Sequence, residues 1–252
     1  MLQPVSILPL NISEKVMVSL RLIFVLALLQ IPVSIPALAQ SGGISLGQTR
    51  VIFSPEDKSQ SISVINSSIR SYLVQSRVQT EPNIVTAAPF IVTPPLFTLK
   101  GDSRQILRIL PQNNLFPTDR ESLFYLSISA IPALDGPVVE QDRLSVGLRF
   151  VLKLFYRPAG LTLLPEEAPC QLTFKRVIQG VQINNPTPYY QTLATLTSNG
   201  RALEIDRKLS MVAPRSSQTL PVEISHQVSW QTVTDYGGLS VLCHQSLIGE
   251  NF

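Results

Sequence analysis

The chain has 252 residues, of which 44% are hydrophobic and only 15% charged, and its formal net charge is +3. This length and apolar content allow one large domain or two small ones, each with its own hydrophobic core. The small net charge, and the lack of a basic stripe with interleaved aromatic residues, argue against nucleic acid as the main partner. With 20 prolines against 12 glycines, the composition favours short strands and turns over long helices.

The N-terminal segment has the pattern of a secretory signal peptide. Basic residues precede an apolar run at 22–29, and an A-x-A cleavage site follows at 37–39. The apolar run is too short to span a membrane. We therefore expect residues 1–39 to be removed on export; the sequence leaves open whether translation starts at Met1 or Met17.

From residue 40 onward the sequence indicates short β-strands separated by turns, with no convincing amphipathic helix between them. The strands expected before residue 157 match the number in an immunoglobulin-like sandwich. A turn at 157–160 then separates them from a second group. We therefore predict an all-β chain with sandwich domains at 40–157 and 158–252. The expected strands are 44–53, 61–66, 72–79, 90–92, 105–110, 122–131 and 144–156, then 170–176, 180–184, 191–197, 208–212, 218–223 and 239–243.

The predicted strand at 144–156 is the most informative segment. Its first half alternates between apolar and polar or small residues, which is typical of a strand with one apolar face. The apolar positions of that half are Leu144, Val146 and Leu148. Its second half is apolar on both faces except at Lys153, whose ammonium group is costly to bury without an anion. Two interpretations remain open: an edge that binds an extended peptide by its C-terminal end, or a core strand whose lysine reaches water.

The chain has two cysteines, Cys170 and Cys243. In an oxidising compartment, an even number is compatible with one disulfide within a domain. The alternative is two buried thiols that never meet, since spacing along the chain does not show proximity in space.

Motifs for catalysis are weak. The segment 43–47 matches the G-x-S-x-G pattern around Ser45, but a nucleophile elbow needs a preceding strand and a following helix, and this segment opens a predicted strand. The histidines, His226 and His244, are expected to be structural or on the surface. No metal-ligand cluster, phosphate-binding glycine loop or nucleotide motif stands out. We expect a binding protein rather than an enzyme, with no catalytic residue, metal or cofactor.

Six segments carry motifs that are specific when taken together, and they span nearly all of the predicted mature chain. They are 48–53 (QTRVIF), 93–95 (TPP), 119–125 (DRESLFY), 153–158 (KLFYRP), 185–190 (NPTPYY) and 235–238 (DYGG). In this order they resemble the periplasmic pilus-assembly chaperones of the chaperone–usher pathway. The resemblance implies two immunoglobulin-like β-sandwich domains in an L-shaped (boomerang) arrangement, in a protein of the bacterial periplasm.

The resemblance also implies roles for particular residues. Arg50 and Lys153 match two cations that anchor the C-terminal carboxylate of a pilus subunit; without the resemblance, Arg50 is better read as a solvent-exposed arginine at a strand edge. Glu121, Arg157 and Asp235 match a charge cluster that sets the angle between the domains. The residues that match the strand lent to the subunit are Leu144, Val146, Leu148 and Phe150.

The implied partners are pilin, fimbrial or adhesin subunits and an outer-membrane usher. We also expect the free protein to self-associate through its exposed apolar edge. The connection at 132–143 is short, as in the group of chaperones that builds rod-like pili, although the sequence does not decide between rods and thin fibres. Thr93–Pro94 is cis in relatives, but an ordinary turn fits as well. The alternative functions are an immunoglobulin-like surface adhesin or structural module and, third, a secreted serine hydrolase.

Overall fold

The computed structural model describes residues 43–112, 116–133 and 146–247. The predicted signal peptide, Leu144 and most of the predicted short connection at 132–143 lie outside these ranges. In the described part of the chain, no helix is long and apolar enough to cross a membrane. The one helical element there is a short 3₁₀ helix, η1 (Ala168–Gln171).

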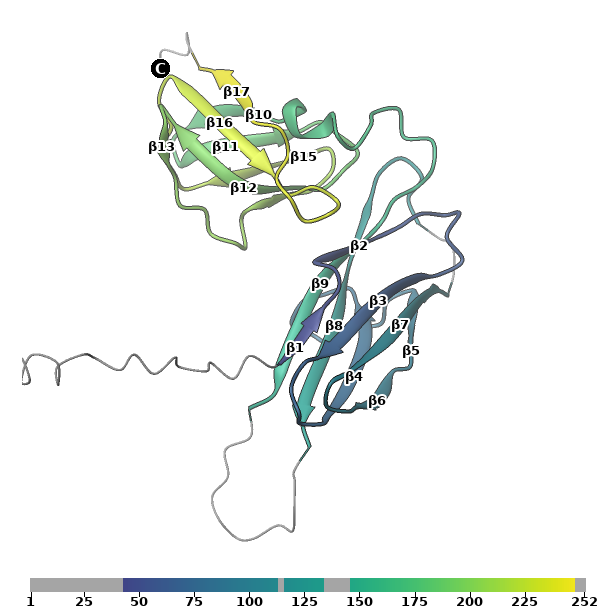
Figure 1. Cartoon of the computed structure of the whole chain (residues 1–252). Helices are drawn as coiled ribbons and strands as arrows, with labels where there is room; N and C mark the ends of the chain where they lie inside the picture. The colour runs from purple at the N-terminus through teal and green to yellow at the C-terminus, as the bar shows by residue number, and fades with distance from the viewer. Residues whose placement is uncertain (1–42, 113–115, 134–145, 248–252) are drawn as a thin grey trace, which may run out of the picture. The chain divides into compact units, whose positions relative to one another are not determined.

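The first group of strands forms a two-sheet sandwich (Figure 1). Its strands are β1 (Ile44–Leu46), β2 (Arg50–Phe53), β3 (Gln60–Asn66), β4 (Tyr72–Gln79), β5 (Phe90–Thr93), β6 (Leu96–Leu99), β7 (Ser103–Pro111), β8 (Ser122–Pro132) and β9 (Leu148–Tyr156). One sheet has the order β1-β3-β7-β5 and the other β2-β9-β8-β4-β6. The Thr93–Pro94 peptide is cis and lies where the chain passes from β5 in one sheet to β6 in the other.

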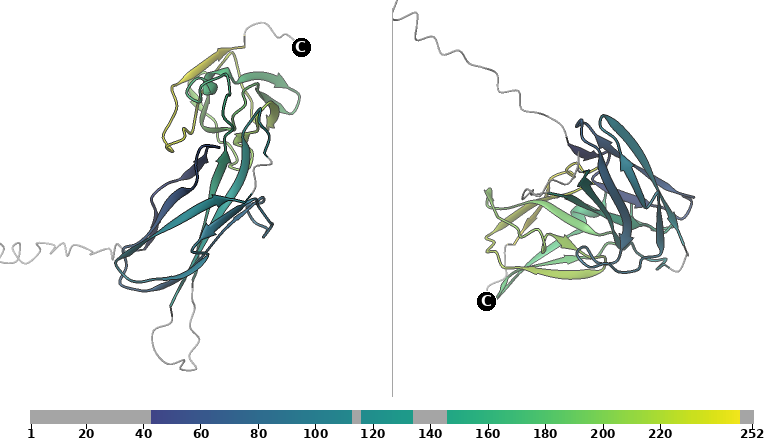
Figure 2. Two further views of the ribbon diagram at one scale, coloured as in Figure 1. Left: turned by 90° about the vertical axis from the view of Figure 1, so that its right-hand side faces the viewer. Right: turned by 90° about the horizontal axis from the view of Figure 1, so that it is seen from below.

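The second group forms another two-sheet sandwich. Its strands are β10 (Thr173–Val177), β11 (Gly180–Asn185), β12 (Gln191–Ser198), β13 (Arg201–Ala202), β14 (Met211–Val212), β15 (Ser216–Leu220), β16 (Gln227–Thr232) and β17 (Cys243–Ser246). The sheets are β10-β11-β15 and β13-β12-β16-β17, with β14 also paired to β12. In the left-hand view of Figure 2, the strands coloured purple to teal and those coloured green to yellow each pack with members of their own group.

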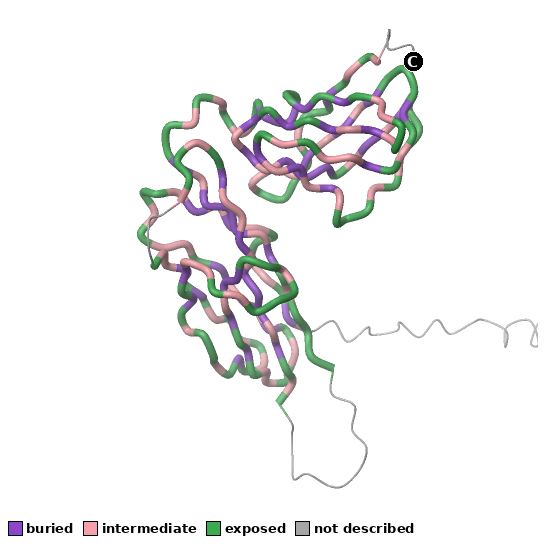
Figure 3. Tube along the Cα trace, turned by 180° about the vertical axis from the view of Figure 1, so that it is seen from behind, coloured by how far each residue is buried: buried purple, intermediate pink, exposed green. Residues whose placement is uncertain are grey.

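Each sandwich has its own hydrophobic core. One core draws its residues from 44–156 and the other from 172–243. Figure 3 shows buried positions recurring along the strands, separated by exposed or intermediate ones, as expected when alternate side chains point inward. In the second core, buried Trp230 donates its indole N–H to the carbonyl of Pro169 at 2.9 Å. The all-β fold with two immunoglobulin-like sandwiches is therefore confirmed.

The two cysteines form a disulfide. Cys170 lies in η1, and Cys243 is the first residue of β17; their Cα atoms are 5.3 Å apart. The bond therefore ties η1 to the end of the β16–β17 connection.

The predicted strand at 44–53 is wrong as a single element. The chain breaks at Gly47–Thr49, where the Gly47 N–H donates to the carbonyl of Ser63 at 3.0 Å. Before the break, β1 pairs with β3 in one sheet; after it, β2 pairs with β9 in the other. No apolar residue lies between Leu46 and Val51, and the buried positions change from Ile44 to Val51 and Phe53, so the apolar alternation is interrupted where the chain changes sheet.

Other strand boundaries also need correction, mostly in the second sandwich. The strand predicted at 239–243 is wrong: Leu239 forms only an isolated bridge with Val233, and β17 begins at Cys243. Residue 170 is helical, so that strand begins at Thr173. The strands predicted at 208–212 and 218–223 are instead β14 and β15, and the strand predicted at 144–156 begins as β9 at Leu148. Strands β6, β13 and β16 are not predicted.

Candidate functional site

Strand β9 connects the two predicted parts of the site. Strand β8 pairs with it along its whole length, from Ala130 opposite Leu148 onward. On its other side, β2 runs parallel to β9 but pairs only with its second half, starting with Arg50 opposite Lys153. Within the described residues, the edge of β9 at 148–152 therefore has no strand partner.

The predicted apolar row lies along this unpaired part of β9. Val146 and Leu148 are 64% and 41% exposed, and Phe150 is partly buried against the first core. Alternate residues of a strand share a face, so Leu148 and Phe150 continue the face of buried Leu152 and Leu154; Val146 lies just before the strand. The sandwich thus has an open end, where a core-facing apolar row is not covered. Predicted Leu144 lies outside the described residues.

The structure brings Arg50 and Lys153 together: they lie opposite each other on the paired strands β2 and β9. The Arg50 Nη1 donates to the carbonyl of Val233 at 3.2 Å, and its guanidinium carbon lies 5.9 Å from the centre of the Phe155 ring. The Lys153 Nζ donates to Thr192 Oγ1 at 3.1 Å. Among the described residues, neither cation forms an ion pair, and the buried Nε of Arg50 has no hydrogen-bond partner.

Both cations are partly desolvated, and this changes their titration. Burial, followed by the neighbouring charge of Arg50, lowers the pKa of Lys153 to about 8. Burial also lowers the pKa of Arg50, against the opposing effects of Asp235 and Glu121. Two adjacent positive groups with poor solvation favour binding of an anion, and a carboxylate can accept a charge-assisted hydrogen bond from each of them.

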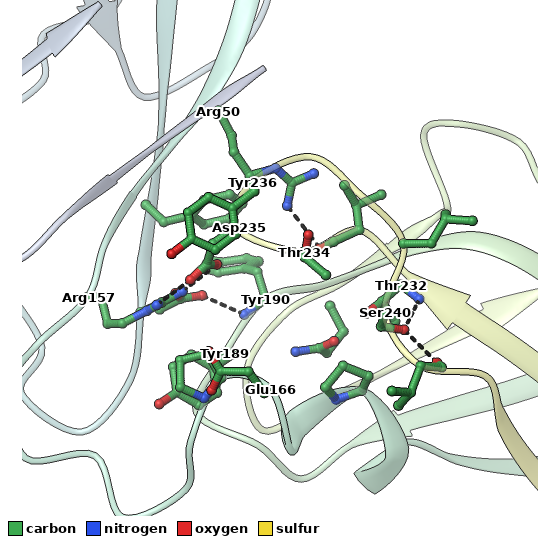
Figure 4. A pocket seen from close by; sticks show the side chains of 18 residues that line it. Arg50, Arg157, Glu166, Tyr189, Tyr190, Thr232, Thr234, Asp235, Tyr236 and Ser240 are labelled. Atoms are coloured by element: carbon green, nitrogen blue, oxygen red, sulfur yellow. Dashed lines mark hydrogen bonds and ion pairs between the residues drawn. The ribbon is translucent and has the colours of Figure 1, made fainter. Parts of the chain in front are cut away.

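The predicted charge cluster also comes together, from three separate segments. Arg157, just after β9, donates from Nε to Glu121 Oε1 at 2.9 Å. Its two Nη atoms donate to Asp235, in the β16–β17 connection, at 2.7 and 2.8 Å. The second oxygen of Glu121 accepts the backbone N–H of Tyr190 at 2.8 Å. These bonds link the first sandwich to the second (Figure 4).

Burial and pairing act in opposite directions on this cluster. Burial raises the pKa of Glu121, which is only 4% exposed, although Arg157 and the Tyr190 N–H favour its charged form. Burial disfavours the charge on Arg157, but the hydrogen bonds to Asp235 and the charges of both acids outweigh it and raise the pKa of the guanidinium. The cluster therefore holds a charged arginine between two acids at neutral pH.

A cavity of about 270 Å³ lies beside the cluster and is lined from both sandwiches. Arg50, Phe155 and Arg157 come from the first, and Tyr190 and Tyr236 are among those from the second (Figure 4). Sequence reasoning assigned no role to Phe155, Tyr190 or Tyr236. All three lie inside the motifs that carry the family resemblance, so those motifs are the sequence signal by which they could have been identified.

The G-x-S-x-G segment does not form a nucleophile elbow. Ser45 is the central residue of β1, and after a turn β2 follows rather than a helix. The Nδ1 of His244 lies 2.9 Å from Ser229 Oγ, so this imidazole is engaged with another serine.

Comparison with protein families agrees with this arrangement of two sandwiches. The model described as "Pili and flagellar-assembly chaperone, PapD N-terminal domain" matches residues 43–162. The model described as "Pili assembly chaperone PapD, C-terminal domain" matches residues 167–243. The chain belongs to this family of pilus-assembly chaperones. The predicted membership is thus confirmed, and the family is one of chaperones rather than of enzymes or adhesins.

Similar proteins and structures carry the same description. The chaperone FimC of Escherichia coli K12 is 39% identical over 202 residues, which cover 79% of this chain and 82% of FimC. The chaperone FocC of Escherichia coli is 36% identical, covering 79% and 87%. The crystal structure of the periplasmic chaperone SfaE matches with a TM-score of 0.70 and 35% identity, covering 81% and 100%. The solved structure described as the Salmonella enterica SafA pilin in complex with the SafB chaperone matches with a TM-score of 0.73 and 34% identity, covering 81% and 96%.

Proposed function

We propose that this chaperone captures pilus subunits in the periplasm by donor-strand complementation. Strand β9 is lent to a subunit whose own sandwich lacks a strand, and Arg50 and Lys153 hold the subunit's C-terminal carboxylate. One observation carries the proposal: the unpaired edge of β9 ends where β2 begins, and the first pair beyond that point is Arg50 with Lys153. A strand added along the edge must stop there, beside both cations.

This arrangement also defines the direction of the added strand. Its C-terminus meets Lys153, near the end of β9, so the added strand runs parallel to β9. Main-chain hydrogen bonds to the edge supply part of the affinity, as in other cases of β-augmentation. Each fully buried apolar side chain adds about 1.5–3 kcal/mol before the costs of association, so Val146 and Leu148 are major contributors.

The two cations suit a carboxylate in different ways. The guanidinium of Arg50 offers a planar fork of N–H donors, including the Nε that lacks a partner among the described residues. The ammonium of Lys153 adds a compact charge on the opposite strand. A subunit terminus bound here is both neutralised and held in register with β9.

The cellular setting is part of the proposal. Residues 1–39 are a cleaved signal peptide, and the mature chain has domains at 40–157 and 158–252. Two solved relatives support the setting, since SfaE is described as periplasmic and SafB as in complex with a pilin. The loaded chaperone delivers its subunit to an outer-membrane usher, with strand exchange supplying the energy. Free chaperone self-associates through the same edge of β9.

The interdomain cluster supports the anchor indirectly. Arg157 joins Glu121 to Asp235, and Asp235 lies two residues beyond the Val233 carbonyl that binds Arg50. We assign the cluster the role of fixing the second sandwich against the Arg50 side of the first. The disulfide between Cys170 and Cys243 restrains the other end of the β16–β17 connection.

The anchor is tested by Arg50→Ala and Lys153→Ala in a strain that exports the chaperone together with subunits of its pilus system. Both variants are expected to fold and to lose more than about 90% of the co-purified subunit, because each removes a charge-assisted bond worth about 1.5–3 kcal/mol. Arg104→Ala, an exposed arginine on β7, is the control. Normal co-purification with both anchor variants contradicts the assignment.

A further inference from the structure

The cavity beside Arg50 has the size and lining of a site for a side chain. Its volume of about 270 Å³ is just below the roughly 300 Å³ at which small-molecule sites begin, so it suits a large side chain better than a cofactor. Much of its wall is apolar. The apolar lining includes Phe155, Pro169, Tyr190, Val233, Leu239 and Val241.

The charged groups around the cavity disfavour an acidic occupant. Glu121 and Asp235 are both bonded to Arg157, and exposed Glu166 is a third carboxylate in the lining. Arg50 is the remaining cation of the lining, and in the proposed function it is engaged by the main-chain carboxylate of the client. An acidic side chain would therefore enter beside three carboxylates without a free cation of its own.

The rim of the cavity is a turn at 234–238 that is fixed next to the anchor. Gly237 has a φ of +84°, and a Cβ there would overlap the Oγ1 of Thr49. Only glycine allows this turn to approach the residue that precedes Arg50 so closely. Tyr236, in the same turn, is 96% exposed, and its ring borders the cavity (Figure 4). The turn thus places a solvent-exposed aromatic ring close to Arg50.

We propose that this cavity binds the side chain of the client's last residue and selects an apolar or aromatic one. The inference rests on the carboxylate anchor proposed above. The last side chain branches from the carbon next to the carboxylate, so a carboxylate held by Arg50 and Lys153 places that side chain at the cavity mouth. Tyr236 and Leu239 at the exposed rim cover it and determine the preference.

The test separates the carboxylate from the side chain. The probes are short fluorescein-labelled peptides of alternating threonine and valine that differ only at the C-terminus: phenylalanine as free acid, phenylalanine as amide, and aspartate as free acid. Binding to the full mature protein is measured by fluorescence anisotropy. The phenylalanine acid is expected to bind about tenfold or more tightly than the aspartate acid, the scale of discrimination by an apolar pocket.

Variants locate the preference. Tyr236→Ser and Leu239→Ser, both at exposed positions, are expected to reduce the preference for phenylalanine over aspartate to less than about threefold while keeping the preference for acid over amide. Ile178→Ser, at a fully exposed position in the β10–β11 turn, is the control and keeps both preferences.

The outcomes distinguish the two proposals. Acid-dependent binding without a phenylalanine preference, or a preference untouched by both rim variants, overturns the side-chain site and leaves the anchor intact. Equal binding of phenylalanine acid and amide overturns the anchor. If none of the peptides binds, both assignments are wrong.

Discussion

Lys153 lies between a second cation and a neutral hydroxyl, and this position explains its titration. The Thr192 hydroxyl accepts one hydrogen bond from the ammonium but offsets no charge. Burial, and then Arg50, therefore lower the pKa of Lys153 to about 8 in the free protein. A bound carboxylate favours the charged ammonium and raises that pKa again. Above pH 8, binding of a client terminus must therefore take up a proton.

The affinity for a client terminus is expected to depend on pH in one direction. It is constant from neutral pH to about 8 and falls by up to about tenfold per pH unit above that, until the pKa of the bound form is reached. Lys153→Arg keeps its charge and removes the fall. The phenylalanine acid peptide, titrated between pH 7 and about 9.5, measures this. An equally steep fall in Lys153→Arg assigns the proton to another group.

At this scale, the sequence indicated the chemistry but not the partners. A lone lysine in an apolar strand left two interpretations open: a buried cation in need of an anion, or a lysine that reaches water. Its contact with Thr192, and that of Arg50 with the carbonyl of Val233, could not be predicted. Both partners belong to the other sandwich, and that of Arg50 is a backbone atom, whose position depends on the fold and not on the identity of the side chain.

Among the elements, β9 is unusual because it combines an unpaired edge with an uncovered apolar row. Such edges promote association, and natural proteins normally protect them. Here the exposure of Val146 and Leu148 is explained if a client covers them. The same surface accounts for the proposed self-association of the free chaperone.

A charge placed on this row is expected to abolish capture without unfolding the protein. Leu148→Asp puts a carboxylate into the proposed subunit groove and should reduce subunit co-purification by more than about tenfold, because desolvating an unpaired charge is costly. The free energy of unfolding should change by less than about 1 kcal/mol, since the position is partly exposed. Subunit pull-down and urea unfolding measure the two effects.

Ile106→Asp is the matched control for this element. Ile106 is 49% exposed, close to the 41% of Leu148, but lies on β7 in the other sheet. It should leave capture unchanged. If both variants capture subunits normally, β9 is not the donor strand; if both lose capture, the effect is not specific to it.

The strands show why sequence patterns predicted the first sandwich better than the second. Long alternating strands such as β8 and β9 are evident because apolar residues recur at every second position. Strand β16 has only Val228 and Trp230 as apolar residues among polar neighbours, so it was not predicted although its tryptophan fills the second core. Conversely, a strand was predicted at 239–243, but Leu239 and Val241 lie in the β16–β17 connection and line the cavity.

At the scale of the whole molecule, two of the ion pairs among the described residues join the sandwiches, and they differ in burial. In the pair between Arg157 and Asp235, the side chains are 16% and 32% exposed, and Arg157 also binds Glu121, whose side chain is 2% exposed. The pair between Arg215 and Asp119 is about half exposed on both sides. Exposed pairs contribute about 0–1 kcal/mol, whereas removing one partner of a buried pair leaves a charge uncompensated. The coupling of the two cores should therefore depend on the cluster.

Asp235→Ala is expected to lower the free energy of unfolding of the second sandwich by about 1–3 kcal/mol, because Arg157 loses two short charge-assisted hydrogen bonds. Asp119→Ala should lower it by less than about 1 kcal/mol. The chain has a single tryptophan, and Trp230 is buried in the second core, so its fluorescence during urea unfolding reports on that sandwich alone.

Because Asp235 also borders the Arg50 side of the cavity, its variant should weaken capture of subunits as well, whereas Asp119→Ala should not. Equal effects of the two variants on unfolding and on capture would show that the cluster has no special role in joining the domains.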